Sequence, residues 1–503
     1  MSHPNPHIDR VSILGEETIL LGFHIFDFLV RDTLSNFKAS TYLIVTDTHL
    51  EKLYLNRLQE SFHRISKELA SVSGAGTRAL PRLLTYIITP GESSKSREVK
   101  SQIEDYFLDQ GCTRDTLVFA MGGGVIGDLV GFVAATFMRG IPFVQVPTTL
   151  LAMVDSSIGG KTAVDTPQAK NSIGAFWQPK RIFIDLSVLE TLPEREFVNG
   201  MAEVIKTAAI WNVSDFVLLE NGAEAIRDAV LKPVRNVEFQ GATLETRTPA
   251  QELLLKVVKA SVAVKSYVVT HDERETGMRG LLNFGHSIGH AIEGLVTPKM
   301  LHGECVAIGM IKEAEIARHC GYLSQVAVGR LTRCIQAYGL PVTMEDKLVK
   351  SHIGNQYCYV EDIMKVLRVD KKNMGSQKRI VMLSSIGRTL EQKATNISDD
   401  VIRKVLAAST VVHPRPVNVS PITLSPPGSK SISNRALVMA ALVVHGNGGK
   451  MHIPDSELYL GNAGTAARFL TTVSVLVPPS SAPDQKMILT GNARMKQRPI
   501  APL

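Results

Sequence analysis

Residues 117–132 read LVFAMGGGVIGDLVGF, which is a short apolar run, three consecutive glycines and then a pattern compatible with a helix. Glycines allow a tight turn after a strand and let a ligand come close to the backbone. The helix that follows would offer unpaired N–H groups and a favourable dipole to a pyrophosphate. Because the spacing GGGxxGD differs from the GxGxxG fingerprint, a purely structural turn is an equally good interpretation of this stretch alone.

Three further apolar runs in the first part of the chain also end in polar turns. These runs, at 40–45, 84–89 and 142–146, are followed by TDT, PGESSK and PTT. Repeated units of strand, polar or glycine turn, and helix predict an α/β fold with a parallel doubly wound sheet. Ligands bind such sheets at the carboxyl ends of the strands, where these turns lie.

The pattern becomes mainly helical after the predicted sheet. Residues 193–211 read as one helix, 222–250 as a polar loop or insertion, and helical patterning resumes at residue 252. Five prolines between residues 414 and 427 predict a linker. The predicted organisation is therefore a Rossmann-like domain at 1–191, a mainly α-helical domain at 192–395, a linker at 396–427 and a truncated α+β tail at 428–503.

Composition favours a soluble, cytoplasmic protein that acts on an anionic small molecule. The 503 residues are 44% hydrophobic and 20% charged, as in globular domains. The net charge of +7 is spread along the chain without a basic run among aromatics, so we expect no nucleic-acid partner. The five cysteines never show CxxC spacing, which favours reduced thiols. The N-terminus lacks a signal-peptide layout, and the most apolar run, 117–138, contains Asp128 and five glycines, so we expect no membrane partner.

Three histidines lie in residues 272–304, DERETGMRGLLNFGHSIGHAIEGLVTPKMLHGE. His286 and His290 are four residues apart in a helical pattern and would project from one face, and His302 follows. Three imidazoles would suit a metal site that takes one more ligand from elsewhere. Without an HExxH glutamate, ordinary polar or buried histidines are an equally good interpretation of the spacing.

Five motifs spread over residues 10–395 resemble the 3-dehydroquinate synthase family. They are MGGGVIGDLVGFVAATFMRG, PTTLLAMVDSSIGGKTAVD, NGMAEVIK, NFGHSIGHAIE and LHGECVAIGM. Further along, SPPGSKSISNRAL, LGNAGTAARFLT and TGNARMKQRPI resemble the beginning of the 5-enolpyruvylshikimate-3-phosphate (EPSP) synthases. Together and in this order, the two resemble the N-terminal end of the fungal pentafunctional arom polypeptides.

The resemblance implies a carbon–oxygen lyase of the shikimate pathway, which leads to chorismate and the aromatic amino acids. Such an enzyme converts 3-deoxy-D-arabino-heptulosonate 7-phosphate to 3-dehydroquinate and phosphate. It uses NAD to oxidise the C5 hydroxyl transiently, eliminates phosphate, and closes the ring by an aldol step. It requires NAD and Zn²⁺ or another divalent metal, and it is expected to form a homodimer.

Two other hypotheses compete with the lyase implied by the resemblance. A related metal-dependent polyol dehydrogenase or another sugar-phosphate cyclase would share the cofactors, but a dehydrogenase would release NADH. A non-catalytic scaffold descended from the enzyme would bind zinc and NAD without releasing phosphate.

By the same resemblance, each expected role falls on numbered residues of this chain. The metal ligands are Glu203, His286 and His302, so His290 is assigned to proton transfer. The catalytic residues are Glu275, His290, Lys161 and Asn171. The substrate-binding residues are Arg139, Asp155, Lys161, Asn171, Asn199, Lys206, Lys265, Arg279, Asn283, His290, His302 and Lys371. The NAD-binding residues are Asp47, Glu92, Lys95, Gly123, Gly124, Val125, Asp128, Thr148, Thr149, Lys170 and Thr191.

The segment that resembles EPSP synthase is shorter than that family. About 22 residues separate Leu437 from Leu460, where the family has a much longer stretch, and the chain stops at Leu503. Missing strands would leave backbone groups unpaired, so we expect no enolpyruvyl transfer and partial disorder after about residue 410. The matched anion-binding residues in this segment are Lys430, Ser431, Arg435, Arg468 and Arg498.

Overall fold

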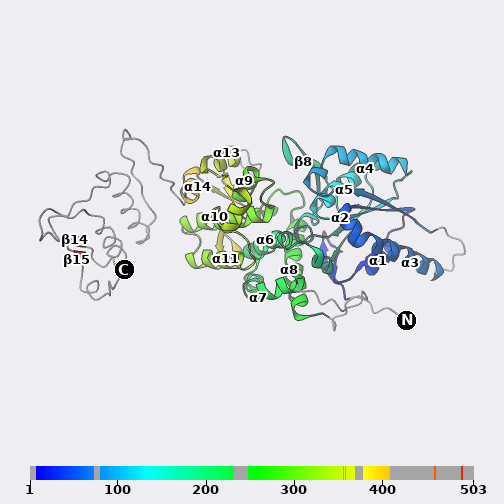
Figure 1. Cartoon of the computed structure of the whole chain (residues 1–503), viewed down its shortest axis with the longest axis horizontal. Helices are drawn as coiled ribbons and strands as arrows, with labels where there is room; N and C mark the ends of the chain where they lie inside the picture. The colour runs from blue at the N-terminus through cyan, green and yellow to red at the C-terminus, as the bar shows by residue number, and fades with distance from the viewer. Residues whose placement is uncertain are drawn as a thin grey trace. The chain divides into compact units, whose positions relative to one another are not determined.

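The computed structural model describes residues 7–72, 80–231, 247–354, 356, 358–368, 378–407, 458–459 and 489–490. The chain divides into two compact units, Met1–Ala408 and Ser409–Leu503 (Figure 1). In the second unit, β14 (Leu458–Tyr459) pairs in parallel with β15 (Leu489–Thr490). The disorder expected after residue 410 falls outside the described residues.

A seven-stranded sheet forms the first part of Met1–Ala408. Its strand order is β1-β2-β9-β6-β5-β3-β4, and every neighbouring pair is parallel except β1 and β2. This confirms the α/β prediction and its four strand candidates. The strands are β1 (Asp9–Ile13), β2 (Glu16–Gly22), β3 (Thr41–Asp47), β4 (Arg82–Ile88), β5 (Leu117–Gly122), β6 (Phe143–Pro147) and β9 (Arg181–Asp185).

Helices cover both faces of this sheet (Figure 1). On one face, α1 (Phe26–Asn36) and α3 (Asn56–Val72) pack with Tyr42 and Phe119. On the other face, α4 (Arg97–Asp109) and α5 (Gly124–Thr136) form a separate core with Leu43. Because successive strand residues point to opposite faces, a sheet covered twice needs apolar residues at every position. This explains the uninterrupted runs YLIV and LVFAM.

Two elements next to the sheet complete this part. The antiparallel hairpin of β7 (Lys161–Thr166) and β8 (Ala169–Phe176) lies outside the seven strands and contacts α5. The sequence did not predict it. No helix in the described part of the chain is long and apolar enough to span a membrane.

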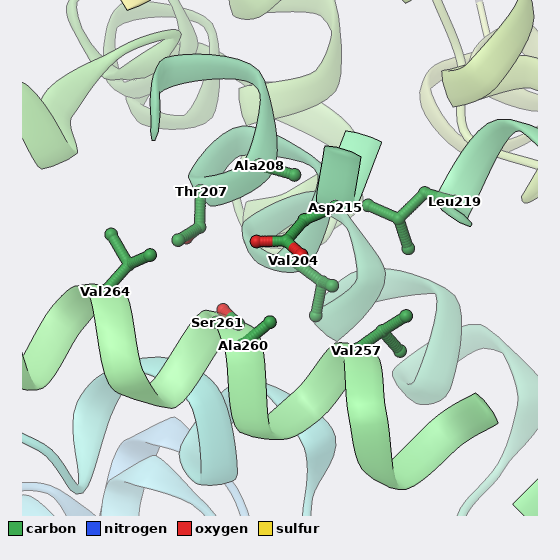
Figure 2. A pocket seen from close by; sticks show the side chains of 9 residues that line it. All are labelled: Val204, Thr207, Ala208, Asp215, Leu219, Val257, Ala260, Ser261 and Val264. Carbon is green, nitrogen blue, oxygen red and sulfur yellow. The ribbon is translucent and has the colours of Figure 1, made fainter. Parts of the chain in front are cut away.

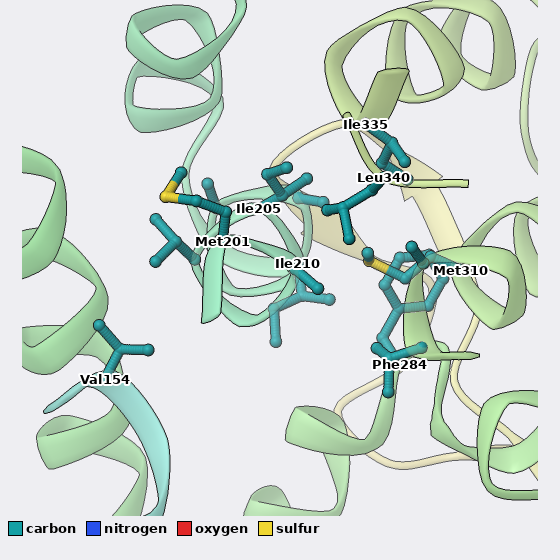
Figure 3. Close-up of a cluster of buried hydrophobic side chains, with 14 of the residues drawn as sticks. Val154, Met201, Ile205, Ile210, Phe284, Met310, Ile335 and Leu340 are labelled. Carbon is teal, nitrogen blue, oxygen red and sulfur yellow. The ribbon is translucent and has the colours of Figure 1, made fainter. Parts of the chain in front are cut away.

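Helix α6 (Glu194–Trp211) runs through the core of the helical part, and it confirms the helix predicted at 193–211. Figure 3 shows its Met201 and Ile205 among side chains from other elements, including Met310 and Ile335. The other helices are α7 (Val213–Leu231), α8 (Pro249–His271), α9 (His286–Val296), α10 (His302–His319), α11 (Gln325–Ala337), α12 (Lys347–Ile353), α13 (Val360–Arg368) and α14 (Asp399–Leu406).

The loop predicted at 222–250 was wrong at both of its ends. Helix α7 continues through Gly222, where a Cβ atom would lie 2.8 Å from the Leu253 side chain, so glycine serves close helix packing there. Pro249 begins α8 behind a capping box formed by Thr248 and Gln251, a position where proline's missing N–H costs nothing. Residues 232–246 lie outside the described part.

The linker predicted at 396–427 began too early. Residues up to Leu406 form the end of β13 (Thr395–Ile397) and helix α14, whose Ile402 is buried and which contacts α10 and α13. The prolines that indicated a linker start only at Pro414, so the composition marked a later point than the boundary drawn from it.

Candidate active site

A cleft of about 1890 Å³ lies where the sheet meets the helical part. The turns that follow β3, β4, β5 and β6 line it, together with residues of α9 and α10. Pockets for one small ligand usually measure about 300–1,000 Å³, so this cleft has room for a dinucleotide and a substrate. By contrast, the pocket of about 10 Å³ among α6, α7 and α8 is barely large enough for one water molecule (Figure 2).

The glycine turn places the start of α5 at this cleft. Gly122 ends β5, and Gly123 is the N-cap of α5 without a side-chain hydrogen bond. A Cβ atom added at Gly123 would lie 3.2 Å from Thr149 Cγ2, and one added at Gly124 would lie 2.9 Å from Ser156 Oγ. The backbone therefore comes as close to its neighbours as glycine permits, and the first N–H groups of α5 form a ready anion site.

All eleven residues assigned to NAD line the cleft, from Asp47 to Thr191. Asp47 caps α2 (Thr48–Leu50), because its Oδ1 accepts hydrogen bonds from the N–H groups of His49 at 2.8 Å and Leu50 at 3.0 Å. The structure thus brings the set together, and the individual contacts with NAD stay a prediction.

Lys95 contacts both a residue predicted to bind NAD, Asp128, and a residue predicted to be catalytic, Asn171. Its Nζ lies 2.6 Å from Asp128 Oδ2 and also donates to Asn171 Oδ1. Burial raises the pKa of Asp128 to about 6, although the nearby Lys95 opposes this rise. Asn171 adopts a positive φ of 54°, so the hairpin backbone is held in an uncommon conformation where its side chain meets Lys95.

The three predicted metal ligands come from three helices. Glu203 lies in the middle of α6, whereas His286 and His302 are the first residues of α9 and α10. Glu203 Oε1 is 3.4 Å from His286 Nε2 and 3.5 Å from His302 Nε2. This oxygen is buried without a hydrogen-bond partner, while Oε2 forms an ion pair with Lys206. A buried, unpartnered carboxylate oxygen between two imidazole nitrogens fits a divalent metal, with open positions for substrate.

The Nδ1 atoms of both imidazoles also have hydrogen-bond partners. His302 Nδ1 is 2.9 Å from Glu293 Oε2, and His286 Nδ1 is 3.1 Å from the carbonyl oxygen of Phe284. With Nδ1–H donating outward, each Nε2 presents its lone pair towards Glu203, which is the arrangement typical of metal-ligating histidines.

The surroundings shift the pKa values of the two imidazoles in opposite directions, because burial and the nearby Lys206 hold the pKa of His286 well below its usual value. Burial alone would lower the pKa of His302, but the carboxylates of Glu203 and Glu293 raise it to about 10. Burial has the opposite effect on a carboxyl and alone would raise the pKa of Glu203, but Lys206 and His302 lower this pKa to about 2. The two carboxylates that favour a proton on His302 would also favour a divalent cation in its place.

His290 lies beside this cluster and lines the cleft. Its ring centroid is 4.9 Å from that of His286 and 5.6 Å from that of His302, and ligand atoms of the three histidines lie within 4.8 Å of one another. Spacing alone paired His286 with His290. The unpartnered Glu203 oxygen instead favours the set Glu203, His286 and His302, which leaves His290 facing the open cleft.

Three of the predicted substrate cations are buried, and one of them, Lys206, contacts the metal cluster through Glu203. Lys265 donates to the carboxylate and the carbonyl oxygen of Asp155, which lines the cleft, and Lys206 pairs with Glu203. Arg279 donates to the carbonyl oxygens of Glu273 at 2.6 Å and Gly159 at 3.2 Å. Lys206 and Lys265 are thus each balanced by a carboxylate, whereas Arg279 is held by neutral carbonyl oxygens.

The remaining predicted residues fall into separate groups. Lys161 forms an ion pair with Glu275, and Asn283 lines the cleft. Asn199 also lines it, but its Oδ1 accepts from Gly303 N at 2.6 Å, so it helps to join α6 to α10. The described residues that line the cleft do not include Arg139, Lys161, Lys206, Lys265 or Arg279. The residues outside the described part are Lys371, Lys430, Ser431, Arg435, Arg468 and Arg498.

Glu293 is a site residue that the sequence prediction missed. It follows His286 by seven residues and His290 by three, so helical spacing already placed it on their face of α9. It accepts from His302 and lies 3.7 Å from Lys170 of the hairpin. The spacing signal was present in the sequence, but the partner on the next helix was not visible there.

Models of one enzyme family match most of Met1–Ala408. Residues 85–199 match the 3-dehydroquinate synthase N-terminal family and residues 200–373 its C-terminal family. Residues 442–503 match EPSP synthase (3-phosphoshikimate 1-carboxyvinyltransferase).

Similar proteins agree with this assignment. The chain is 50% identical over 537 residues to the pentafunctional AROM polypeptide of Schizosaccharomyces pombe, covering 99% of this chain and 33% of that protein. It is 49% identical over 538 residues to that of Yarrowia lipolytica, covering 99% and 34%. It thus spans about a third of the length of the curated relatives it matches.

A solved structure of 2-epi-5-epi-valiolone synthase from Streptomyces hygroscopicus subsp. jinggangensis 5008, with NAD+ and Zn2+ bound, shares the fold. It superposes with a TM-score of 0.61 at 25% identity, covering 79% of this chain and 98% of that one. The motifs, the fold and the matches at residues 85–373 lead to one conclusion: the chain belongs to the 3-dehydroquinate synthase family and carries part of an EPSP synthase domain after it.

Proposed function

We propose that this chain is a 3-dehydroquinate synthase, a carbon–oxygen lyase that converts 3-deoxy-D-arabino-heptulosonate 7-phosphate to 3-dehydroquinate and phosphate. The observation that carries the proposal is a cleft lined both by the glycine turn at the start of α5 and by His302, whose Nε2 lies 3.5 Å from the buried Glu203 Oε1. A dinucleotide site and a metal site that share one cleft suit transient oxidation of a substrate alcohol.

NAD would supply a hydride acceptor that later returns the hydride, and a divalent metal would supply positive charge beside the substrate oxygens. The residues present fit both groups. The start of α5 offers backbone N–H groups to a pyrophosphate, and Glu203 Oε1 lacks a partner between two imidazoles. The 2-epi-5-epi-valiolone synthase at 25% identity has NAD+ and Zn2+ bound, which supports the same pair of cofactors here.

The predicted substrate-binding cations would suit the substrate, which carries a phosphate and a carboxylate. Lys206, Lys265 and Arg279 are buried, so bulk water would screen their field only weakly. Lys161 is exposed and paired with Glu275, and it can exchange this partner for a substrate anion. Binding through several fixed cations would orient the substrate before reaction.

His290, which lines the cleft, would accept protons from the substrate and return them to it. An imidazole titrates near neutrality, which suits a group that must both accept and donate. Glu275, Lys161 and Asn171 are the other candidates. The hairpin carries Lys161 and Asn171 while α9 carries His290, so these candidates come from two separate elements.

The proposal is tested by substrate-dependent phosphate release from the purified chain supplied with NAD and Zn²⁺. We expect release from the wild type and its loss in Glu203→Gln, which removes the shared carboxylate from the cluster. Steady NADH accumulation with a polyol, without phosphate release from the heptulosonate, would favour a dehydrogenase. Binding of zinc and NAD without either reaction would favour a scaffold.

We also propose a cytoplasmic location, which the free state of all five cysteines supports, three of them buried. That the chain forms a homodimer stays a prediction. That it has no nucleic-acid partner and no membrane partner also stays a prediction. Sedimentation of the full chain would test the dimer directly.

A further inference from the structure

The first turn of α9 is capped by a side chain from another helix. The N-cap residue of α9, Gly285, has a positive φ of 78° and no side chain that could accept a hydrogen bond. Glu313 of α10 takes this role. Its carboxylate accepts from the N–H groups of Gly285 at 2.7 Å, Ser287 at 2.9 Å and Ile288 at 3.1 Å. The fully buried carboxylate thus satisfies donors on both sides of His286 and suits the helix dipole.

One face of α10 joins this cap to the metal cluster. His302, Val306, Gly309 and Glu313 follow one another at spacings of four, three and four residues, so they lie on the same face. A Cβ atom at Gly309 would lie 2.0 Å from the carbonyl oxygen of Gly285. The two helices therefore meet backbone against backbone between the cap and His302.

We propose that Glu313 is a positioning residue for the metal centre. By fixing the first turn of α9 against α10, it sets where His286 Nε2 lies relative to His302 Nε2 and Glu203. Glu313 is not among the described residues that line the cleft, so its action passes through His286. This inference rests on the proposed metal site and adds a residue that neither the motifs nor the ligand set indicated.

The test is Glu313→Gln in the full chain, followed by its zinc affinity in competition with a chelating dye. The amide keeps the shape of the side chain but turns one acceptor into a donor that faces backbone N–H groups. Mutating a direct outer partner of a metal ligand typically costs 10–100-fold in metal affinity, and we expect a loss of about tenfold because Glu313 holds the backbone beside His286 and not its ring. The visible spectrum of bound Co²⁺ should also change, because the ligand geometry changes.

Asp185→Asn is the matched control. Asp185 is likewise buried and accepts from the backbone N–H groups of His24 and Ile25, both at 2.8 Å, but it belongs to the sheet. We expect it to lower Tm while zinc affinity and the Co²⁺ spectrum stay those of the wild type.

Unchanged zinc affinity in Glu313→Gln, or an equal loss in Asp185→Asn, would overturn the inference and leave Glu313 a structural cap. If Glu313→Gln does not fold, Glu313→Asp is measured instead, because it keeps the charge with a shorter reach. Its zinc affinity should fall by less than the loss expected for Glu313→Gln. Unchanged affinity in that variant would overturn the inference as well. Failure of the wild type to bind zinc or Co²⁺ would instead overturn the metal site itself, so the two failures are distinguishable.

Discussion

His290 is the residue at which two interpretations of the histidine cluster differ. Helical spacing pairs it with His286 on a metal, whereas the unpartnered oxygen of Glu203 gives the metal to Glu203, His286 and His302. We predict that His290→Ala keeps its zinc and loses phosphate release by about 10²–10⁴-fold, the usual contribution of a general acid or base. Metal analysis of the dialysed protein, combined with a phosphate assay, checks both parts.

Glu203→Gln is the comparison for that experiment, because it should lose zinc and activity together. Loss of zinc from His290→Ala to the same extent would mean that spacing alone had identified the ligands.

Individual side chains could be predicted only as far as a pattern or a resemblance marked them. The pair His286 and His290 follows from helical spacing, but Glu203 lies more than eighty residues earlier and looks like any helix carboxylate. Its role came from the resemblance of NGMAEVIK. The structure adds the physical reason, which is a buried oxygen that faces two imidazoles.

At the scale of the element, the turn between β5 and α5 is the most sensitive part of the nucleotide side. In Gly124→Ala the new methyl group would lie 2.9 Å from Ser156 Oγ, and this hydroxyl must move within the lining of the cleft. We predict that NAD binding weakens by about tenfold, or about 1.4 kcal/mol. Calorimetric titration with NAD measures it.

Gly329→Ala is a suitable control for that titration. It lies in α11, where the nearest atom to the new Cβ would be 3.7 Å away, so NAD affinity should not change. Equal NAD affinity in Gly124→Ala and the wild type would show that the turn is only structural.

The loop that carries Glu275 and Arg279 depends on one carboxylate. Asp272 accepts from the backbone N–H groups of Thr276 at 2.7 Å, Gly277 at 2.8 Å and Arg279 at 2.9 Å. Burial would raise the pKa of Asp272, but these bonds lower it from 3.8 to about 2. Its stabilising effect is therefore complete above about pH 4 and is lost as pH falls towards 2.

We predict that Asp272→Asn lowers the free energy of unfolding at pH 7 by about 1 kcal/mol. The difference from the wild type should shrink steadily between about pH 4 and pH 2. Urea unfolding of both proteins across this range measures it. A difference that stays constant with pH would exclude an ionised Asp272 as the cause.

Whole elements were predictable where one signal dominated. The runs of β3 and β5 are apolar at every position because both faces of the sheet are covered. The hairpin of β7 and β8 gave no such signal, since β8 has no buried position. The predicted loop at 222–250 failed because Gly222 and Pro249 both have places inside or at the start of helices.

Across the whole of Met1–Ala408, the proposed chemistry needs two halves of one cleft. The turns of the sheet and the starts of α9 and α10 are far apart in the sequence, and no local pattern predicts that they meet. The resemblance supplied their shared purpose, and the structure supplies the contacts, such as Lys170 of the hairpin lying 3.7 Å from Glu293 of α9.

The number of phosphates released for each NAD distinguishes a lyase that recycles its NAD from a dehydrogenase that consumes it. The full chain, loaded with zinc and one equivalent of NAD, is given excess 3-deoxy-D-arabino-heptulosonate 7-phosphate, and phosphate and NADH are followed together. We predict many phosphates for each NAD with no net NADH, because the hydride returns to the substrate within each turnover. NADH that accumulates in proportion to the substrate consumed would show that the hydride does not return to the substrate. No phosphate release at all would show that the chain is not a 3-dehydroquinate synthase.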